Sequence, residues 1–391
     1  MLSPKIGYPL VAPRWSLSLL LLLALLLTAC APKVPPTPKI PPVPPPAAPA
    51  RIPAQWQDLP GWRNDDHAAA LQTFLQGCTA LQRREDWKPL CDEAATIDPG
   101  EARIFFELRF EPWQLQQEDG TTEGMITGYY GPELQGRRTP GGPYRYPIYG
   151  WPQDMLVVDL SSLYPELSGM RLRGRVEGRR LVPYWSREEI ARTPELLRGQ
   201  ELLYVADPVD LYYLHIQGSG RIVLEDGTKV MVGYENQNGH PYRSIGKLLI
   251  DRGQMTRDQM SMQNIKAWGQ QHPDQIMALL AENPSYIFFH ELPPEITSPP
   301  GSLGTPLVAE RSLAVDTRTV PLGAPVYLAT TRPDDGSPLQ RLMVAQDTGG
   351  AIKGRVRADF FWGMGTAAGE LAGRMKQQGR MWLLLPRKAA Q

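Results

Sequence analysis

Residues 341–365 read RLMVAQDTGGAIKGRVRADFFWGMG, and this stretch decides the predicted fold. It begins with an apolar strand, 342–345, which breaks at the turn Asp347-Thr348-Gly349-Gly350. We expect the strand to re-form through 351–354 and to reach Asp359, which three aromatic residues follow. Glycine permits tight turns and the close approach of a ligand. The pattern therefore predicts that Asp347 and Asp359 converge on one surface.

Asp359 is a candidate for a raised pKa, because the aromatic residues 360–362 would desolvate its charged form. The cations Lys353, Arg355 and Arg357 would lower that pKa if they pointed toward it. The alternative interpretation makes Asp347 a turn residue and Asp359 an ordinary surface acid.

The composition of the 391-residue chain allows a large core and more than one domain. Lys plus Arg and Asp plus Glu number 41 each, so no net positive field favours nucleic acid as a partner.

The first 29 residues are predicted to be a lipoprotein signal peptide. The apolar run from Leu17 to Leu27 is shorter than the about 20 residues that span a bilayer, and it suits a secretory signal. It ends in Leu-Thr-Ala-Cys30, which resembles the bacterial lipobox and predicts lipidation of Cys30. Ala31 then favours the outer membrane, with the globular part facing the periplasm; the alternative is a plain signal peptide. Acyl chains on Cys30 would give stable anchoring, and the proline-rich segment 30–53 would act as a semi-rigid linker.

Cys78 and Cys91 are the cysteines that remain after Cys30. In an oxidising compartment we expect them to form a disulfide, and two buried free thiols are the alternative. Cys78 lies in a predicted helix that Asn64 or Asp65 caps, with apolar residues at helical spacing up to Leu81.

Two strands are predicted next. Residues 103–110 alternate apolar and charged side chains, which indicates a half-buried strand. Residues 125–130 form a second strand that enters a Gly131-Pro132 turn. Its Tyr129 and Tyr130 serve either packing or stacking on sugar faces.

The segment 136–290 is interpreted as an inserted α+β domain. Ser186 and Glu189 form a capping box, and Asp226-Gly227 predicts a hairpin. Gln217 and Ser219, beside small residues, would offer hydrogen-bond donors to a polar ligand. A helical stretch continues to residue 280.

The remaining residues resume strands at 307–315, 326–328 and 381–385, with a turn beginning at Asp316 and a helix at 367–378. Many short strands with glycine turns favour a small closed barrel.

Three further features of the sequence argue against other classes of protein. The histidines show no metal-binding spacing, so no metal or cofactor is predicted. Gly349 and Gly354 precede Arg355 rather than Lys-Ser/Thr, which excludes a phosphate loop. Asp347-Thr348-Gly349 matches the aspartic protease triplet, but the sequence has no second copy, so only a homodimer could use it.

Several long motifs in one order resemble the membrane-bound lytic murein transglycosylase A family of Gram-negative bacteria. They are GYYGP at 128–132, QGSGRI at 217–222, NGHPYRSIGKLLIDRG at 238–253, MSMQ at 260–263 and NPSYIFF at 283–289. The C-terminal part resembles the domain named for three aspartates, here Asp316, Asp347 and Asp359. The resemblance covers nearly all of the chain from Trp56 onward.

The resemblance implies a mainly β fold with α: a double-psi β-barrel, formed by 54–135 and 291–391 with an N-terminal helical segment, and the inserted domain 136–290. A groove between them would hold a peptidoglycan glycan strand. The implied reaction cleaves the β-1,4 bond between N-acetylmuramic acid and N-acetylglucosamine and leaves a 1,6-anhydro end. The family motif places the catalytic acid at Asp359, makes Asp347 a supporting residue and leaves Asp316 structural. The candidate substrate-binding residues are Tyr129, Tyr130, Gln217, Ser219, Tyr242, Arg243, Lys353 and Trp362.

The implied reaction can be catalysed by a single carboxyl group. Glycosidases usually need two carboxylates, but an anhydro product uses the C6 hydroxyl of the substrate as the nucleophile. Asp359 would act as acid and then as base, which requires a raised pKa. We expect a monomer, with the cell-wall synthesis machinery as a further partner. Two other classes stay open: a non-catalytic peptidoglycan-binding lipoprotein and a dimeric aspartic peptidase.

Overall fold

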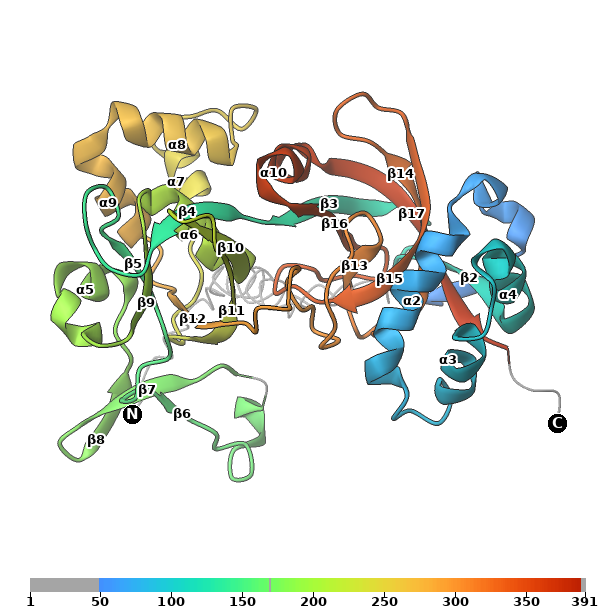
Figure 1. Ribbon diagram of the computed structural model, residues 1–391, viewed down its shortest axis with the longest axis horizontal. Helices are drawn as coiled ribbons and strands as arrows, with labels where there is room; N and C mark the ends of the chain where they lie inside the picture. The colour runs from blue at the N-terminus through green and yellow to red at the C-terminus, as the bar shows by residue number, and fades with distance from the viewer. Residues whose placement is uncertain (1–48, 169, 388–391) are drawn as a thin grey trace, which may run out of the picture. The chain divides into compact units, whose positions relative to one another are not determined.

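The computed structural model describes residues 49–168 and 170–387 (Figure 1). The predicted signal peptide, the lipidation site Cys30 and the linker as far as residue 48 lie outside the described residues. Within the described ranges, no helix has both the length and the apolar character needed to cross a membrane.

The first sheet of the described chain has eight strands in the order β1-β2-β17-β14-β15-β13-β16-β3. Because β17 also pairs with β3, the six strands from β17 to β3 hydrogen-bond in a closed ring. Such closure is what a small barrel requires; the double-psi connection stays a prediction. The strands are β1 (Arg51–Pro53), β2 (Phe110–Leu115), β3 (Gly124–Gly131), β13 (Ser312–Val315), β14 (Pro325–Thr331), β15 (Pro338–Asp347), β16 (Ala358–Met364) and β17 (Lys376–Pro386).

Two helices near the N-terminus, α2 (His67–Leu81) and α4 (Ala102–Arg109), pack against this sheet, and α3 (Lys88–Ala94) packs on α2 (Figure 1). The side chain of Asp66, one residue beyond the predicted cap, accepts a hydrogen bond from the backbone of Ala69 and so caps α2. A disulfide between Cys78 and Cys91, with Cα atoms 5.5 Å apart, joins α2 to α3.

The predicted strand at 103–110 was wrong, because these residues form α4 and the strand β2 begins only at Phe110. The alternation had placed Ile104 and Leu108 in the core, yet they are 48% and 63% exposed. Phe105 and Phe106 are buried instead and pack their rings against Phe74 of α2. Tertiary packing of adjacent aromatic residues on one helical face outweighs the period-two pattern.

A second sheet of six strands has the order β12-β11-β10-β4-β9-β5, and a third has the order β6-β7-β8. Only Pro132 separates β3 from β4, so the predicted turn is a direct passage from the first sheet into the second (Figure 1). Gly227, with φ of 82°, forms the predicted hairpin turn between β10 and β11. The strands are β4 (Glu133–Arg137), β5 (Tyr146–Tyr149), β6 (Leu156–Val157), β7 (Arg173–Glu177), β8 (Arg180–Pro183), β9 (Glu201–Val205), β10 (Ser219–Leu224), β11 (Lys229–Gln237) and β12 (Ile287–Glu291).

The helices of this region are α5 (Arg187–Arg192), α6 (Pro208–Gln217), α7 (Ile245–Asp251), α8 (Met262–Gln271) and α9 (Pro273–Ala281). Ser186 and Glu189 form the predicted capping box at the start of α5. Gly218, with φ of 76°, ends α6 in the left-handed conformation and turns the chain into β10.

Near the C-terminus, two predicted boundaries were wrong. The strand expected through 351–354 does not form, because the chain turns there, with Gly354 at φ of 128°, and β16 begins at Ala358. The strand expected at 307–315 is confined to β13. The helix α10 (Gly365–Arg374) starts two residues earlier than predicted and ends before β17.

Candidate functional site

The two predicted catalytic aspartates lie on either side of one small residue. Ala314 of β13 pairs with Asp347 of β15 and also with Asp359 of β16. Neighbouring strands lie about 4.8 Å apart, and the register of β13 with β15 shifts between Leu313 and Ala314. The two strands that flank β13 therefore place the aspartates about 10 Å apart at Cα, and the Asp347 charge acts on Asp359.

Asp359 is held by a short hydrogen bond from its neighbour on the next strand. Asp359 pairs with Thr127 of β3, and the Thr127 hydroxyl donates to Asp359 Oδ1 at 2.6 Å. Burial raises the pKa of Asp359 above its ordinary value. The Thr127 hydrogen bond and the Arg357 charge oppose this rise, and the nearby Asp347 charge adds to it.

Asp347, at the end of β15, receives more donors. The backbone N–H and the hydroxyl of Ser302 both donate to Asp347 Oδ1 at 2.9 Å. Burial raises the pKa of Asp347, whereas donors from Thr348, Ser302 and Tyr129 act in the opposite direction. These donors favour the charged form of Asp347.

Tyr129 connects the two aspartates to the neighbouring cavity. Burial first, and then the Asp347 and Asp359 carboxylates, raise the pKa of its phenol well above the usual value. Its enclosed hydroxyl lies beside Asp347 but makes no hydrogen bond of regular geometry within the described chain. Its ring packs on Phe361 at 5.1 Å. The phenol therefore stays neutral and is available to donate a hydrogen bond.

A cavity of about 630 Å³ opens beside these groups, a size typical of small-ligand sites. Its walls come from both sheets: Tyr129, Tyr130, Asp347 and Phe361 on one side, and Gln217 with Ser219 on the other. Asp359 lies next to this wall, within electrostatic reach of both Tyr129 and Asp347. The structure thus brings together six of the predicted site residues.

Four predicted substrate-binding residues lie elsewhere or face away. Tyr242 and Arg243 line a separate cavity, where Arg243 pairs with Glu282 at 3.0 Å. Trp362 is 4% exposed and its indole N–H contacts Met375 Sδ in the core, because alternate residues of β16 face opposite sides. Lys353 is exposed in the turn before β16 and does not line the cavity.

The same alternation corrects the expected source of desolvation. Phe360 and Trp362 pack on each other at 4.6 Å in the core, whereas Phe361 shares the face of Asp359. Phe361 and Tyr129 therefore supply the aromatic surface beside the carboxyl group.

Several residues of the cavity wall had no signal in the sequence. Ser302 comes from the Gly- and Pro-rich loop before β13, and Tyr234 exposes 41% of its surface on β11. His290 of β12 also lines the cavity and pairs with Glu235 at 2.6 Å. Loops carry functional side chains disproportionately, and the loop composition was the one feature that could have drawn attention to Ser302.

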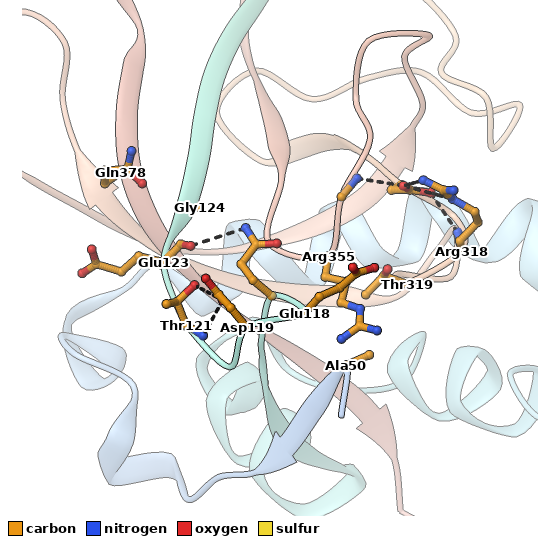
Figure 2. A pocket seen from close by; sticks show the side chains of 13 residues that line it. Ala50, Glu118, Asp119, Thr121, Glu123, Gly124, Arg318, Thr319, Arg355 and Gln378 are labelled. Carbon is orange, nitrogen blue, oxygen red and sulfur yellow. Dashed lines mark hydrogen bonds and ion pairs between the residues drawn. The ribbon is translucent and has the colours of Figure 1, made fainter. Parts of the chain in front are cut away.

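Asp316, the third aspartate, is not in this wall. Arg318 binds its carboxylate at 2.6 Å and the backbone N–H of Gly354 donates to it at 2.9 Å, which together hold its pKa well below the ordinary range. It lines a different hollow of about 870 Å³, shown in Figure 2. Arg318 lies on one side of that hollow, and Asp119 and Thr121, which hydrogen-bond to each other, lie on the other side (Figure 2).

No group of three or more His, Cys, Asp or Glu side chains within 49–168 and 170–387 is arranged to hold a metal ion. The candidate site presents carboxyl, hydroxyl and phenol groups, which suit acid–base chemistry on a polar ligand.

Comparisons with known proteins place the chain in a class. Residues 125–290 match the family described as MltA specific insert domain, and residues 311–385 match the 3D domain. Membrane-bound lytic murein transglycosylase A of Escherichia coli K12 is 35% identical over 292 residues, which cover 73% of this chain and 72% of that protein.

Comparison with solved structures leads to the same class of protein. The crystal structure of MltA from Neisseria gonorrhoeae superposes with a TM-score of 0.78 at 39% identity, over 88% of this chain and 99% of that one. Escherichia coli MltA with bound chitohexaose superposes with a TM-score of 0.65 at 29% identity, over 88% and 93%.

These matches define the class as enzymes that cleave peptidoglycan. The chain belongs to the membrane-bound lytic murein transglycosylase A family. This assignment favours the enzyme over the binding lipoprotein and the peptidase.

Proposed function

We propose that this enzyme cleaves the β-1,4 bond between N-acetylmuramic acid and N-acetylglucosamine and leaves a 1,6-anhydro end, with Asp359 as the single acid and base. The observation that carries the proposal is the half-buried Asp359 carboxyl group, whose pKa is raised. Among the described residues, its one hydrogen-bond donor is the neutral hydroxyl of Thr127. A raised pKa is what a carboxyl group needs to donate a proton near neutral pH.

The reaction balances without water. Asp359 gives its proton to the glycosidic oxygen as the bond from C1 to that oxygen breaks. The resulting carboxylate takes the proton of the C6 hydroxyl, whose oxygen then bonds to C1. The proton returns to Asp359, and the product is one shorter chain and one anhydro-ended chain.

Asp347 stabilises the positive charge that develops at C1. Its hydrogen bonds from Ser302 and Thr348 favour its charged form, against the effect of its burial. With its Cα about 10 Å from that of Asp359, it can face the same sugar without contacting the departing oxygen.

The cavity beside the two aspartates supports a glycan as the substrate. Tyr129 and Tyr234 offer aromatic surface, and Gln217 with Ser219 offers polar groups from the opposite wall. Chitohexaose is the ligand named for the related Escherichia coli structure. We further infer that the closed ring of strands is a double-psi barrel, and that Cys30 anchors the chain to the outer membrane with the enzyme in the periplasm.

The test is digestion of purified sacculi in H₂¹⁸O by the protein lacking residues 1–48, followed by mass spectrometry. We expect anhydro-muropeptides without ¹⁸O, and no release by the matched Asp359→Asn protein. Reducing ends that carry ¹⁸O would show hydrolysis and contradict the proposal. Cleaved peptides without new glycan ends would instead support the peptidase.

A further inference from the structure

Thr127 was not predicted as a functional residue, yet it connects a cation to the proposed acid. It lies in the middle of β3, and Asp359 is its partner on β16. Arg357 Nη2 donates to Thr127 Oγ1 at 2.8 Å, and Thr127 Oγ1 donates to Asp359 Oδ1 at 2.6 Å. The three side chains form a continuous chain of hydrogen bonds.

The direction of these hydrogen bonds follows from which groups are able to donate. A guanidinium group has no acceptor, so Thr127 must accept from Arg357. The one hydroxyl hydrogen of Thr127 then points to Asp359 Oδ1, because no other acceptor for it is found among the described residues. A distance of 2.6 Å is typical of a hydroxyl donor on a carboxylate oxygen.

The geometry assigns to Thr127 the role of a positioning residue that keeps the transferable proton of Asp359 on Oδ2. This inference rests on the proposed role of Asp359 as acid and base. Oδ1 is occupied by the Thr127 hydrogen, whereas no protein donor is found on Oδ2 in the described chain. The same oxygen therefore gives the proton in the first step and takes it in the second, so the carboxyl group need not rotate between them.

The other charged and titratable groups around this pair are few. Asp347 and Tyr129 act on Asp359 from β15 and β3, and Arg357 acts from the position just before β16. Lys376 of β17 is the backbone partner of Thr127 on its other side and is exposed. Arg357 is fixed independently of Thr127, since it also donates to the carbonyl groups of Ala358 and Met125.

A purely structural reading is that Thr127 is a β-branched residue that suits a strand. Valine has nearly the same shape, so Thr127→Val separates the two readings. Thr127→Ser restores the hydroxyl without the methyl group. Thr330→Val is the matched control, because the Thr330 hydroxyl donates to the carbonyl of Gln378 at 2.7 Å in the same ring of strands.

The experiment measures kcat, KM and the pH dependence of kcat for release of anhydro-muropeptides, together with the melting temperature. For Thr127→Val we expect kcat to fall about 10- to 100-fold, the usual effect of one hydrogen bond to a charged group, with KM unchanged. Loss of the Thr127 donor disfavours the carboxylate, so the alkaline limb of the profile should move to higher pH. Thr127→Ser should restore most of kcat, and Thr330→Val should leave kcat within about twofold while lowering stability.

Two results would overturn the inference. One is a Thr127→Val enzyme with wild-type kcat and an unshifted pH profile. The other is a loss of kcat that Thr127→Ser does not restore, which would assign the effect to packing. If Asp359→Asn is inactive in either case, the proposed function stands without this role for Thr127; an active Asp359→Asn would remove the proposed function itself.

Discussion

The region around Asp316, just after β13, and the region around Asp359, in β16, each hold an aspartate, yet the pKa values of the two move in opposite directions. Asp316 is 3% exposed, but a guanidinium and a backbone N–H lie on its oxygens and lower its pKa. Asp359 accepts instead from a neutral hydroxyl, and its desolvation prevails over the opposing effects of that hydrogen bond and of the Arg357 charge. The balance between donors and desolvation therefore differs at the two residues: the donors prevail at Asp316, and desolvation prevails at Asp359, the proposed catalytic residue.

The largest expected effect in this comparison comes from Asp359→Asn. Asparagine has nearly the same shape but cannot exchange a proton. The rate of anhydro-muropeptide release should therefore fall by roughly 10²–10⁴-fold or more. Release of anhydro-muropeptides measures it, with a melting curve and a sacculus pull-down to show that fold and binding persist. Retention of more than about a tenth of wild-type turnover would rule out Asp359 as the acid.

Asp347→Asn should have a smaller effect, about tenfold on kcat, because it removes one stabilising charge and no proton transfer. The Asp347 charge raises the pKa of Asp359. Its removal should therefore lower that pKa and move the alkaline limb of the kcat profile to lower pH. A profile that shifts upward, or an enzyme more impaired than Asp359→Asn, would exchange the roles of the two residues.

Asp316→Asn should lower stability, because it removes the charge that Arg318 pairs with, and should change kcat less than about twofold. A depressed pKa contributes stability that is present above the ordinary Asp value, near 3.9, and is lost as pH falls below it. Urea unfolding of wild type and variant at pH 7 and pH 3 measures this. The difference between them should shrink at pH 3; a constant difference would contradict the ion-pair account.

The sequence predicted the apolar strand that ends at Asp347, because its composition is local information, but it placed the strand that leads to Asp359 too early, at 351–354. It could not predict Thr127 as a partner of Asp359, since the two lie 232 positions apart and meet only through the register of β3 with β16. Ser302 likewise depends on where a long loop returns to the end of β15.

The residues whose positions were predicted wrongly were misplaced for different physical reasons. Trp362 could have been assigned to the core, because three residues from Asp359 along a strand is the opposite face. The helix α4 was missed because Phe105 and Phe106 are adjacent, and only their contacts with Phe74 show which period applies. Tyr242 and Arg243 belong to a motif of the family resemblance, and a motif does not state which cavity its residues line.

The central claim is tested most directly by ¹³C NMR titration of the aspartate carboxyl carbons, with Asp359→Asn and Asp316→Asn used to assign the two signals. The account predicts that Asp359 titrates above the ordinary value near 3.9 and Asp316 below it. An Asp359 signal that titrates at or below the ordinary value would show that desolvation does not prevail there, and would contradict its assignment as the proton donor.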